Sequence, residues 1–285
     1  MQREFLKYKK MIKICSLIKL IRPINVCLGA LSVLIIHSFS ILNSVTILTI
    51  IVVTSFISIS NIINDLFDQK TDKINKKEKF SQLPLLYVYF FLVIILILGL
   101  FSAIQLNDYS KIISFIILPF IIIYTPIFKG VPLLGNFLVS ICVGLVFIFA
   151  EITMYNSIKF SIFPFIFSFM MSLSREIIKD LEDVEGDKKN LIRTFPVIYG
   201  EKRTIMVTIC TIILLNLIVL IPYLLNIYYF NYLIAVIIGV ILPNVYCISY
   251  LMNKKKKYNY QFIQKVQKFT TVCGLFIIYL MKNYF

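Results

Sequence analysis

Long apolar runs recur along the whole chain, and short segments rich in charged and turn-forming residues separate them. A run of about 20 apolar residues is long enough for an α-helix to cross the hydrocarbon core of a bilayer. The pattern predicts nine transmembrane helices around a central cavity, within a single transmembrane domain over residues 1–285. The predicted spans are 22–41, 45–66, 83–103, 110–126, 133–155, 159–181, 204–226, 231–252 and 267–284.

Composition agrees with this pattern. Hydrophobic residues make up 59% of the 285 residues and charged residues 15%, whereas soluble domains carry roughly 45–50% and about 25%. We therefore expect an all-α, polytopic membrane protein. The 6 cysteines are scattered without paired spacing, which is typical of small buried hydrophobes rather than disulfides or metal ligands. The single histidine, His37, is expected at the membrane interface, and its isolation argues against histidine-dependent hydrolases.

The net charge of +15 would suit nucleic acid, but the distribution of the charge indicates another cause. With the N-terminus in the cytoplasm, the predicted spans place all but three of the 29 Lys and Arg residues at the cytoplasmic side. This asymmetry follows the positive-inside rule, so the charge faces anionic lipid and we expect no nucleic-acid partner. Residues 1–21 are interpreted as a basic cytoplasmic leader rather than a cleaved signal peptide.

Acidic residues are concentrated in two short stretches, which hold nine of the 14. Both stretches lie at the cytoplasmic ends of predicted spans, the second and the sixth. In the first stretch, Asn64, Asp68 and Asp72 are spaced i, i+4, i+8. If the helix continues through them, all three side chains point from one face.

The second stretch repeats this arrangement. Asp180, Asp183 and Asp187 are spaced i, i+3, i+7, again on one helical face. Gly186 is expected to end or loosen the helix just before the last aspartate. Clustered carboxylates at a helix C-terminus repel each other and oppose the helix dipole. A bound cation would offset both effects and explain why the acid is placed there. Oxygen-only ligands favour Mg²⁺, which also bridges to phosphates, and two opposed faces would hold metal on both sides of one diphosphate.

Two other interpretations of the acidic stretches remain open. They are either solvated helix ends paired with Lys70, Lys73, Lys179 and Lys188, or the carboxylates of a transporter or cation channel. Two motifs of helical spacing on one membrane face weaken the first alternative. Transport carboxylates tend to lie near the bilayer midplane, whereas these lie at its edge, which weakens the second.

Several basic and phenolic residues near the same membrane face are candidates for binding a diphosphate. Lys129 and Tyr124 share one short loop, and Lys129 is the only charge in it, which favours a functional role. For Arg22, Arg175 and Lys179, a role in topology alone is equally compatible with the sequence.

At the two motifs the sequence resembles the UbiA superfamily of intramembrane prenyltransferases. The resemblance implies nine transmembrane helices, with one aspartate-rich motif on the second and one on the sixth. It also implies transfer of a prenyl group from a prenyl diphosphate. By the same resemblance, the residues that hold Mg²⁺ and carry the catalysis are Asn64, Asp68, Asp72, Asp183 and Asp187.

A narrower resemblance lies after the second motif. Residues 175–200, REIIKDLEDVEGDKKNLIRTFPVIYG, resemble the branch that makes digeranylgeranylglyceryl phosphate, as do residues 20–25 and 132–136. This branch implies geranylgeranyl diphosphate as donor and the lipid phosphate geranylgeranylglyceryl phosphate as acceptor. The alternative acceptor is an aromatic ring, as in quinone, haem or chlorophyll-type synthesis. The sequence departs from the family at residues 75–84, NKKEKFSQLP, where lysines replace the usual arginine and a Pro-Ser-Gly turn is missing.

Overall fold

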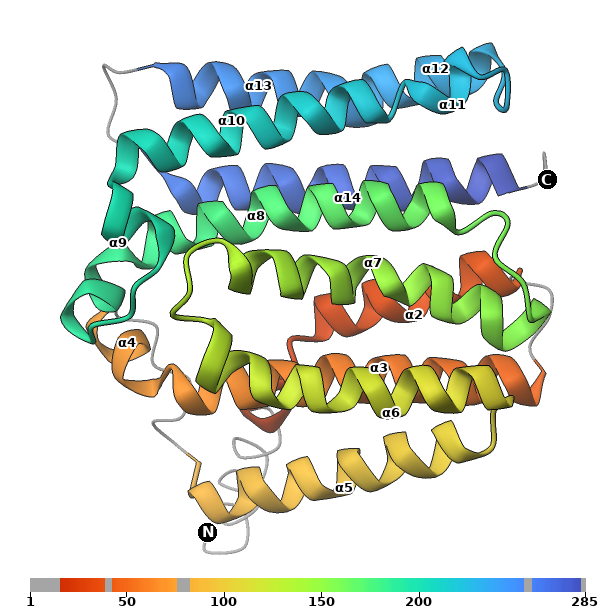
Figure 1. Cartoon of the computed structure of the whole chain (residues 1–285), viewed down its shortest axis with the longest axis horizontal. Coiled ribbons are helices and arrows are strands. Elements are labelled where there is room, and N and C mark those ends of the chain that lie inside the picture. Colours follow the sequence, from red (N-terminus) through yellow and green to blue (C-terminus); the bar gives the residue numbers. More distant parts are fainter. Residues whose placement is uncertain (1–15, 39–42, 76–82, 254–257, 283–285) are drawn as a thin grey trace, which may run out of the picture.

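A computed structural model describes residues 16–38, 43–75, 83–253 and 258–282 of the chain. Every element in this part is a helix, and the long helices lie side by side as a bundle (Figure 1), so the all-α prediction is confirmed. Most of the predicted leader lies outside the described residues. The helices are α2 (Pro23–His37), α3 (Ser44–Phe67), α4 (Gln69–Ile74), α5 (Leu85–Ile104), α6 (Asp108–Ile123), η1 (Tyr124–Phe128), α7 (Leu134–Tyr155), α8 (Ile162–Lys189), α9 (Phe195–Tyr199), α10 (Glu201–Ile218), α11 (Ile221–Leu224), α12 (Phe230–Val236), η2 (Ile237–Ile241), α13 (Leu242–Met252) and α14 (Tyr260–Lys282).

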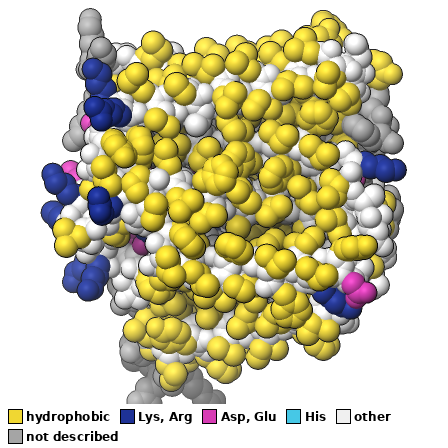
Figure 2. Space-filling model, in the orientation of Figure 1, with side chains coloured by type: hydrophobic (Ala, Val, Ile, Leu, Met, Phe, Trp, Pro, Cys, Tyr) yellow, Lys and Arg dark blue, Asp and Glu magenta, His cyan; other side chains and the backbone are white. Residues whose placement is uncertain are grey.

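Membrane-spanning character is clear from length and composition. Within the described residues, 6 helical runs are long and apolar enough to cross a bilayer. Figure 2 shows apolar side chains over most of the visible face, with Lys and Arg gathered mainly along the edge where α4 and α9 lie. The other three predicted spans correspond to α2, which has only 15 residues, and to α8 and α14, which are polar over part of their length. The protein is a multi-pass membrane protein, and the count of nine crossings stays a prediction.

Several helices extend beyond the predicted spans, because polar sequence continues as helix. α14 begins at Tyr260, before the predicted span 267–284, and α8 runs on to Lys189, past the predicted span 159–181. Gly186 therefore does not end its helix. A Cβ at this position would lie 2.6 Å from Asn75 Nδ2 and 2.8 Å from Thr71 Cγ2. The glycine is required because α4 packs directly against α8 at this point.

The first acidic motif crosses a junction between two helices instead of lying in one. α3 ends at Phe67 and α4 begins at Gln69. The backbone hydrogen bonds nevertheless continue through the junction, because the Asp68 amide donates to Asn64 O at 2.9 Å and the Asp72 amide to Asp68 O at 2.7 Å. These i to i−4 bonds keep the motif close to helical geometry, and all three of its side chains are buried.

The end of the bundle away from α4 contains two buried polar groups. His37, expected at the interface, is fully buried, and its Nε2 donates to the Ala150 carbonyl at 2.8 Å. Its Nδ1 lies 2.9 Å from the Thr46 hydroxyl. Glu151, which lies on α7 next to Ala150, accepts hydrogen bonds from the segment that leads into α8. These contacts tie α2, α3, α7 and α8 together at this end.

Candidate active site

The first motif is buried and meets a cation from the loop after η1. Asn64, Asp68 and Asp72 are each less than a tenth exposed. The Lys129 ammonium forms a partly buried ion pair with Asp68, which agrees with the functional interpretation of this lone charge. One residue after Asn64, Asp65 Oδ1 accepts from the Arg22 guanidinium at 2.6 Å. This pair fixes the start of α2 against the end of α3.

The second motif lies on the last turns of α8, beyond the predicted span. Asp187 is almost fully buried, and its Oδ2 accepts from the Thr194 hydroxyl at 3.2 Å. Its Oδ1 is buried without a hydrogen-bond partner. Burial raises the pKa of the Asp187 carboxyl to about 6, although Lys129 acts in the opposite direction. An ionised, incompletely hydrogen-bonded carboxylate in a buried position is costly, and a cation would relieve the cost.

One asparagine joins the two motifs. Asn75, three residues after Asp72, donates from Nδ2 to Asp183 Oδ1 at 3.1 Å and accepts from the Gly186 amide at 3.1 Å. Sequence reasoning missed Asn75, because its partners lie more than 100 residues away along the chain. Its i+3 spacing from Asp72 was the one available signal, since it places both on one face.

The two motifs lie close enough for their charges to interact. Asp187 interacts with Asp68 and Lys129 of the first side as well as with Asp183 of its own helix. In the described part of the chain, no group of three or more His, Cys, Asp or Glu side chains is close enough to hold a metal ion. Lys129 pairs with Asp68 instead. The all-oxygen donor set and the unpartnered, buried Asp187 Oδ1 nevertheless fit Mg²⁺, which takes oxygen ligands and keeps several waters.

The alternative of simple helix-end ion pairs finds little support. Of the four lysines proposed as partners, only Lys179 forms an ion pair among the described residues, with Glu176 at 3.4 Å. Asp180 is also separate from the metal-binding set, because its Oδ2 accepts from Asn136 Nδ2 on α7 at 2.9 Å. Among the described residues, Lys70, Lys73 and Lys188 therefore form no ion pair with the carboxylates of the motifs.

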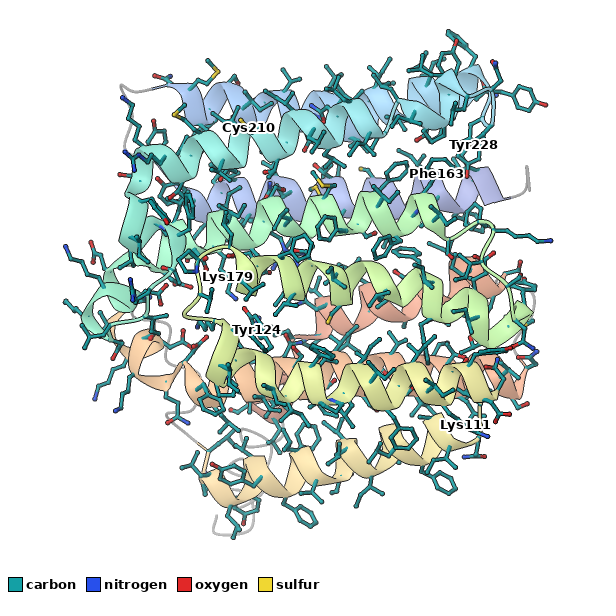
Figure 3. The ribbon with its side chains drawn as sticks, in the orientation of Figure 1. Lys111, Tyr124, Phe163, Lys179, Cys210 and Tyr228 are labelled. Atoms are coloured by element: carbon teal, nitrogen blue, oxygen red, sulfur yellow. The ribbon has the colours of Figure 1, made fainter. Side chains whose placement is uncertain are left out.

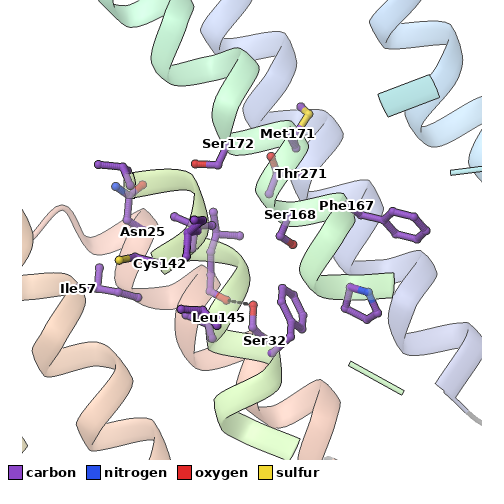
Figure 4. Close-up of a pocket in the computed structure, with 18 of the residues that line it drawn as sticks. Asn25, Ser32, Ile57, Cys142, Leu145, Phe167, Ser168, Met171, Ser172 and Thr271 are labelled. Carbon is purple, nitrogen blue, oxygen red and sulfur yellow. Dashed lines mark hydrogen bonds between the residues drawn. The ribbon is translucent and has the colours of Figure 1, made fainter. Parts of the chain in front are cut away.

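A cavity of about 530 Å³ opens beside the motifs and runs along the bundle. Arg22, Asn64, Tyr124, Arg175 and Lys179 all line its polar end. The remaining wall is mainly apolar and aromatic, with Phe163 and Tyr228 at the opposite end of the bundle (Figure 3). Figure 4 shows part of this wall, where helices α2, α7, α8 and α14 meet.

The length of the cavity follows from the helix that lines it. Phe163 and Lys179, both on α8, are 16 residues apart, which corresponds to about 24 Å at 1.5 Å per residue. A charged mouth and a long apolar interior suit an amphiphile whose anionic head binds at the carboxylates and whose hydrocarbon chain fills the interior. All five candidate diphosphate contacts lie at or beside this mouth, including Lys129 through its pair with Asp68.

Several known proteins are similar to this chain in sequence and in fold. A digeranylgeranylglyceryl phosphate synthase from Methanocaldococcus jannaschii is 32% identical over 219 residues, covering 74% of this chain and 74% of the relative. A solved structure that concerns digeranylgeranylglyceryl phosphate synthase in membranes has a TM-score of 0.72 and 29% identity, covering 94% of this chain and 98% of that chain.

A structure of a UbiA homologue from Archaeoglobus fulgidus, bound to DMAPP and Mg²⁺, shares the fold at a TM-score of 0.67. Its identity to this chain is 15%, with 94% of this chain and 99% of that chain covered. The model of the UbiA prenyltransferase family matches residues 26–267. This match covers most of the chain and confirms the resemblance seen at the two acidic motifs. The chain therefore belongs to the UbiA prenyltransferase family.

Proposed function

We propose that the protein transfers a geranylgeranyl group from geranylgeranyl diphosphate to the free hydroxyl of geranylgeranylglyceryl phosphate, in ether membrane lipid synthesis. The observation that carries the proposal is the pair of neighbouring carboxylate motifs, buried except for the half-buried Asp183, at the mouth of a long apolar cavity. Relatives named digeranylgeranylglyceryl phosphate synthase, of whose length 74–83% is matched at 29–32% identity, support this donor and acceptor.

Five oxygen-bearing residues are proposed to hold Mg²⁺ at the mouth. Asn64, Asp68 and Asp72 lie on one side of the site, and Asp183 and Asp187 on the other. The bound metal supplies positive charge where the departing diphosphate becomes more negative. Asn75 keeps the two sides at a fixed separation, since it contacts Asp183 while continuing the helix that carries Asp72.

Cationic side chains at the mouth are proposed to bind the diphosphate. Lys129 and Lys179 both interact electrostatically with Asp68, so their ammonium groups are close to where the donor head would lie. Tyr124 lies within electrostatic range of Lys179 and offers a phenolic hydroxyl. Arg22 is held by Asp65 at the same mouth. Fixed positive groups that meet developing negative charge lower the barrier to bond cleavage.

The reaction exchanges one C–O bond for another. The bond between the allylic C1 and the diphosphate oxygen breaks, and the electron pair leaves with the diphosphate. The acceptor hydroxyl oxygen attacks C1, forms the ether bond and loses its proton to the diphosphate or to water. The apolar cavity holds the chain and keeps water away from the electron-poor C1, which prevents hydrolysis of the donor.

The proposal also takes the chain as one domain with the N-terminus and both motifs in the cytoplasm. Lys111, one of the three basic residues predicted outside, lies at the end of the bundle opposite Lys179 (Figure 3). This separation supports the predicted orientation, because basic residues concentrate on the cytoplasmic side.

Transfer of labelled geranylgeranyl from its diphosphate tests this function directly. The purified protein is assayed in detergent with Mg²⁺ or EDTA, and geranylgeranylglyceryl phosphate and 4-hydroxybenzoate are offered separately. Mg²⁺-dependent label in the lipid phosphate alone is the expected result. Label in the aromatic acceptor alone would move the enzyme to quinone-type synthesis, and label in neither would reject both acceptors.

A further inference from the structure

Three helices carry the same pair of residue types where they meet the mouth of the cavity. Arg22 begins α2 and Arg175 lies on α8, and both line the cavity. Lys268 lies on α14, which packs against both of these helices. One turn deeper than its basic residue, each helix carries a small polar residue that lines the cavity: Asn25 on α2, Ser172 on α8 and Thr271 on α14. Lys268 itself is not among the lining residues. The three helices thus form an upper basic tier and a lower polar tier.

The basic tier is only partly neutralised by ion pairs. Arg22 pairs with Asp65 at 2.6 Å. Lys268 is half-buried and within electrostatic range of Arg22 and Arg175, and of Glu176 and Glu182, yet it forms no ion pair with a described residue. Arg175 has only a long contact of 3.7 Å to its neighbour in sequence, Glu176. Like charges brought together in a partly buried position repel each other, so this arrangement calls for an anion.

Two members of the polar tier have groups that the protein itself does not use, whereas the Thr271 hydroxyl donates to Gln267 O at 2.9 Å. Ser172 Oγ is buried and has no hydrogen-bond partner. The Asn25 amide forms no side-chain hydrogen bond to any described residue. Figure 4 shows Asn25, Ser172 and Thr271 among the residues around the pocket. A buried polar group is normally paired, so the unused Ser172 hydroxyl beside the cavity indicates a polar ligand. The partly buried Asn25 amide lines the same cavity.

From these two tiers we infer that α2, α8 and α14 form the binding site for the glycerol phosphate head of the acceptor. Arg175 and Lys268 bind the phosphate, and Asn25 and Ser172 bind the glycerol oxygens. The inference rests on the proposed function, and it moves Arg175 from the donor to the acceptor. Ser172 lies three residues from Arg175 on α8, a rise of about 4.5 Å, which is a suitable offset between a phosphate and a glycerol hydroxyl.

The position of this site relative to the carboxylates explains how two anionic heads bind at once. Lys179 and Lys129 interact with Asp68 on the metal side, whereas Arg175 interacts with Lys268 on the α14 side. The donor and the acceptor thus have neighbouring sets of cations at one mouth, and the sets meet at Glu176, which pairs with both Lys179 and Arg175. Arg22, which is held by Asp65 and also interacts with Lys268, lies between the two sets.

Steady-state transfer with two acceptors tests the assignment. The acceptors are geranylgeranylglyceryl phosphate and the same lipid without phosphate, and the variants are Arg175→Gln and Lys268→Gln. For the phosphorylated acceptor, each variant is expected to raise KM about tenfold or more, while KM for the donor stays within roughly twofold. For the dephosphorylated acceptor, the variants should match the unaltered enzyme. Lys265→Gln, which removes an exposed charge from the same helix, is the control and should change neither KM.

Each remaining outcome has a definite meaning. A raised donor KM in Arg175→Gln, or an unchanged acceptor KM in both variants, would overturn the acceptor site and leave the proposed function standing. Equal KM values of the unaltered enzyme for the two acceptors would also overturn the acceptor site and leave the proposed function standing. Failure of the unaltered enzyme to use geranylgeranylglyceryl phosphate would overturn the proposed function and this site with it. Thermal unfolding of each variant shows whether the fold is retained.

Discussion

The two ends of the bundle bury polar groups in opposite ways. At the end away from the cavity mouth, Glu151 accepts from the amides of Lys159, Phe160 and Ser161 at 2.9–3.1 Å and from the Ser161 hydroxyl at 2.5 Å. At the mouth, Asp187 has one oxygen with a single weak partner and one with none.

This difference separates structural from functional carboxylates. A carboxylate that accepts four hydrogen bonds has its charge stabilised by the protein and needs no ligand. A buried carboxylate with an unused oxygen costs free energy, and such a cost persists where a ligand compensates for it. The two ends therefore predict opposite responses to mutation, and the following experiments are arranged by expected free-energy change.

The largest effect is expected at the mouth. Asp187→Asn and Asp72→Asn remove negative charge that we propose binds Mg²⁺, and each should lower kcat/KM by about 10²–10³-fold. For Asp187→Asn, stability should stay equal or rise, because a buried charge with an unpartnered oxygen is lost. Initial rates and the apparent melting temperature in detergent measure both quantities. Turnover retained in both variants would rule out the two-motif mechanism.

The second effect is expected at the opposite end. Glu151→Ala leaves the amides before α8 without an acceptor and should destabilise the fold by about 2–3 kcal/mol. The rate per folded molecule should not change, since Glu151 lies at the far end of the bundle. Thermal unfolding and active-site titration separate the two. A variant that is stable but inactive would contradict the structural role.

The close approach of α4 to α8 gives the third test. Gly186→Ala brings a methyl group into contact with Asn75 and Thr71, which should cost about 1–3 kcal/mol and push the motifs apart. Activity should therefore fall together with stability. Gly130→Ala is the matched control, because nothing lies within 4 Å of a Cβ there. Equal behaviour of the two variants would show that helix spacing does not govern activity.

The smallest effect concerns the residue that joins the motifs. Asn75→Ala removes one hydrogen bond to Asp183 and one from the Gly186 amide. We expect the loss to raise the activation barrier by about 1 kcal/mol, which lowers kcat/KM about fivefold. Asn190→Ala is the comparison, since Asn190 donates to Thr71 and contacts no carboxylate. If Asn190→Ala lowers the rate as much as Asn75→Ala, the role of Asn75 is packing rather than positioning of Asp183.

Much of the molecule could be predicted because lipid limits what a chain can do. Backbone groups inside a bilayer must be hydrogen-bonded within the segment, so apolar runs of sufficient length become helices. The carboxylate motifs could be predicted because their spacing matches the helical period. Acid at these helix C-termini also opposes the helix dipole, which indicates a bound cation. Family membership followed from the same residues.

Tertiary structure decided the remainder, because it depends on residues far apart in sequence. Only the packing of α4 on α8 explains why residue 186 has no side chain, and only this packing brings Asn75 into contact with Asp183. Only the assembled bundle shows that Asp65 forms an ion pair with Arg22 and that Asp180 accepts a hydrogen bond from Asn136. It also shows that Glu151 accepts hydrogen bonds from the segment before α8. Periodicity along the sequence specifies which face of a helix a residue occupies, whereas its partner is set by which other helix covers that face.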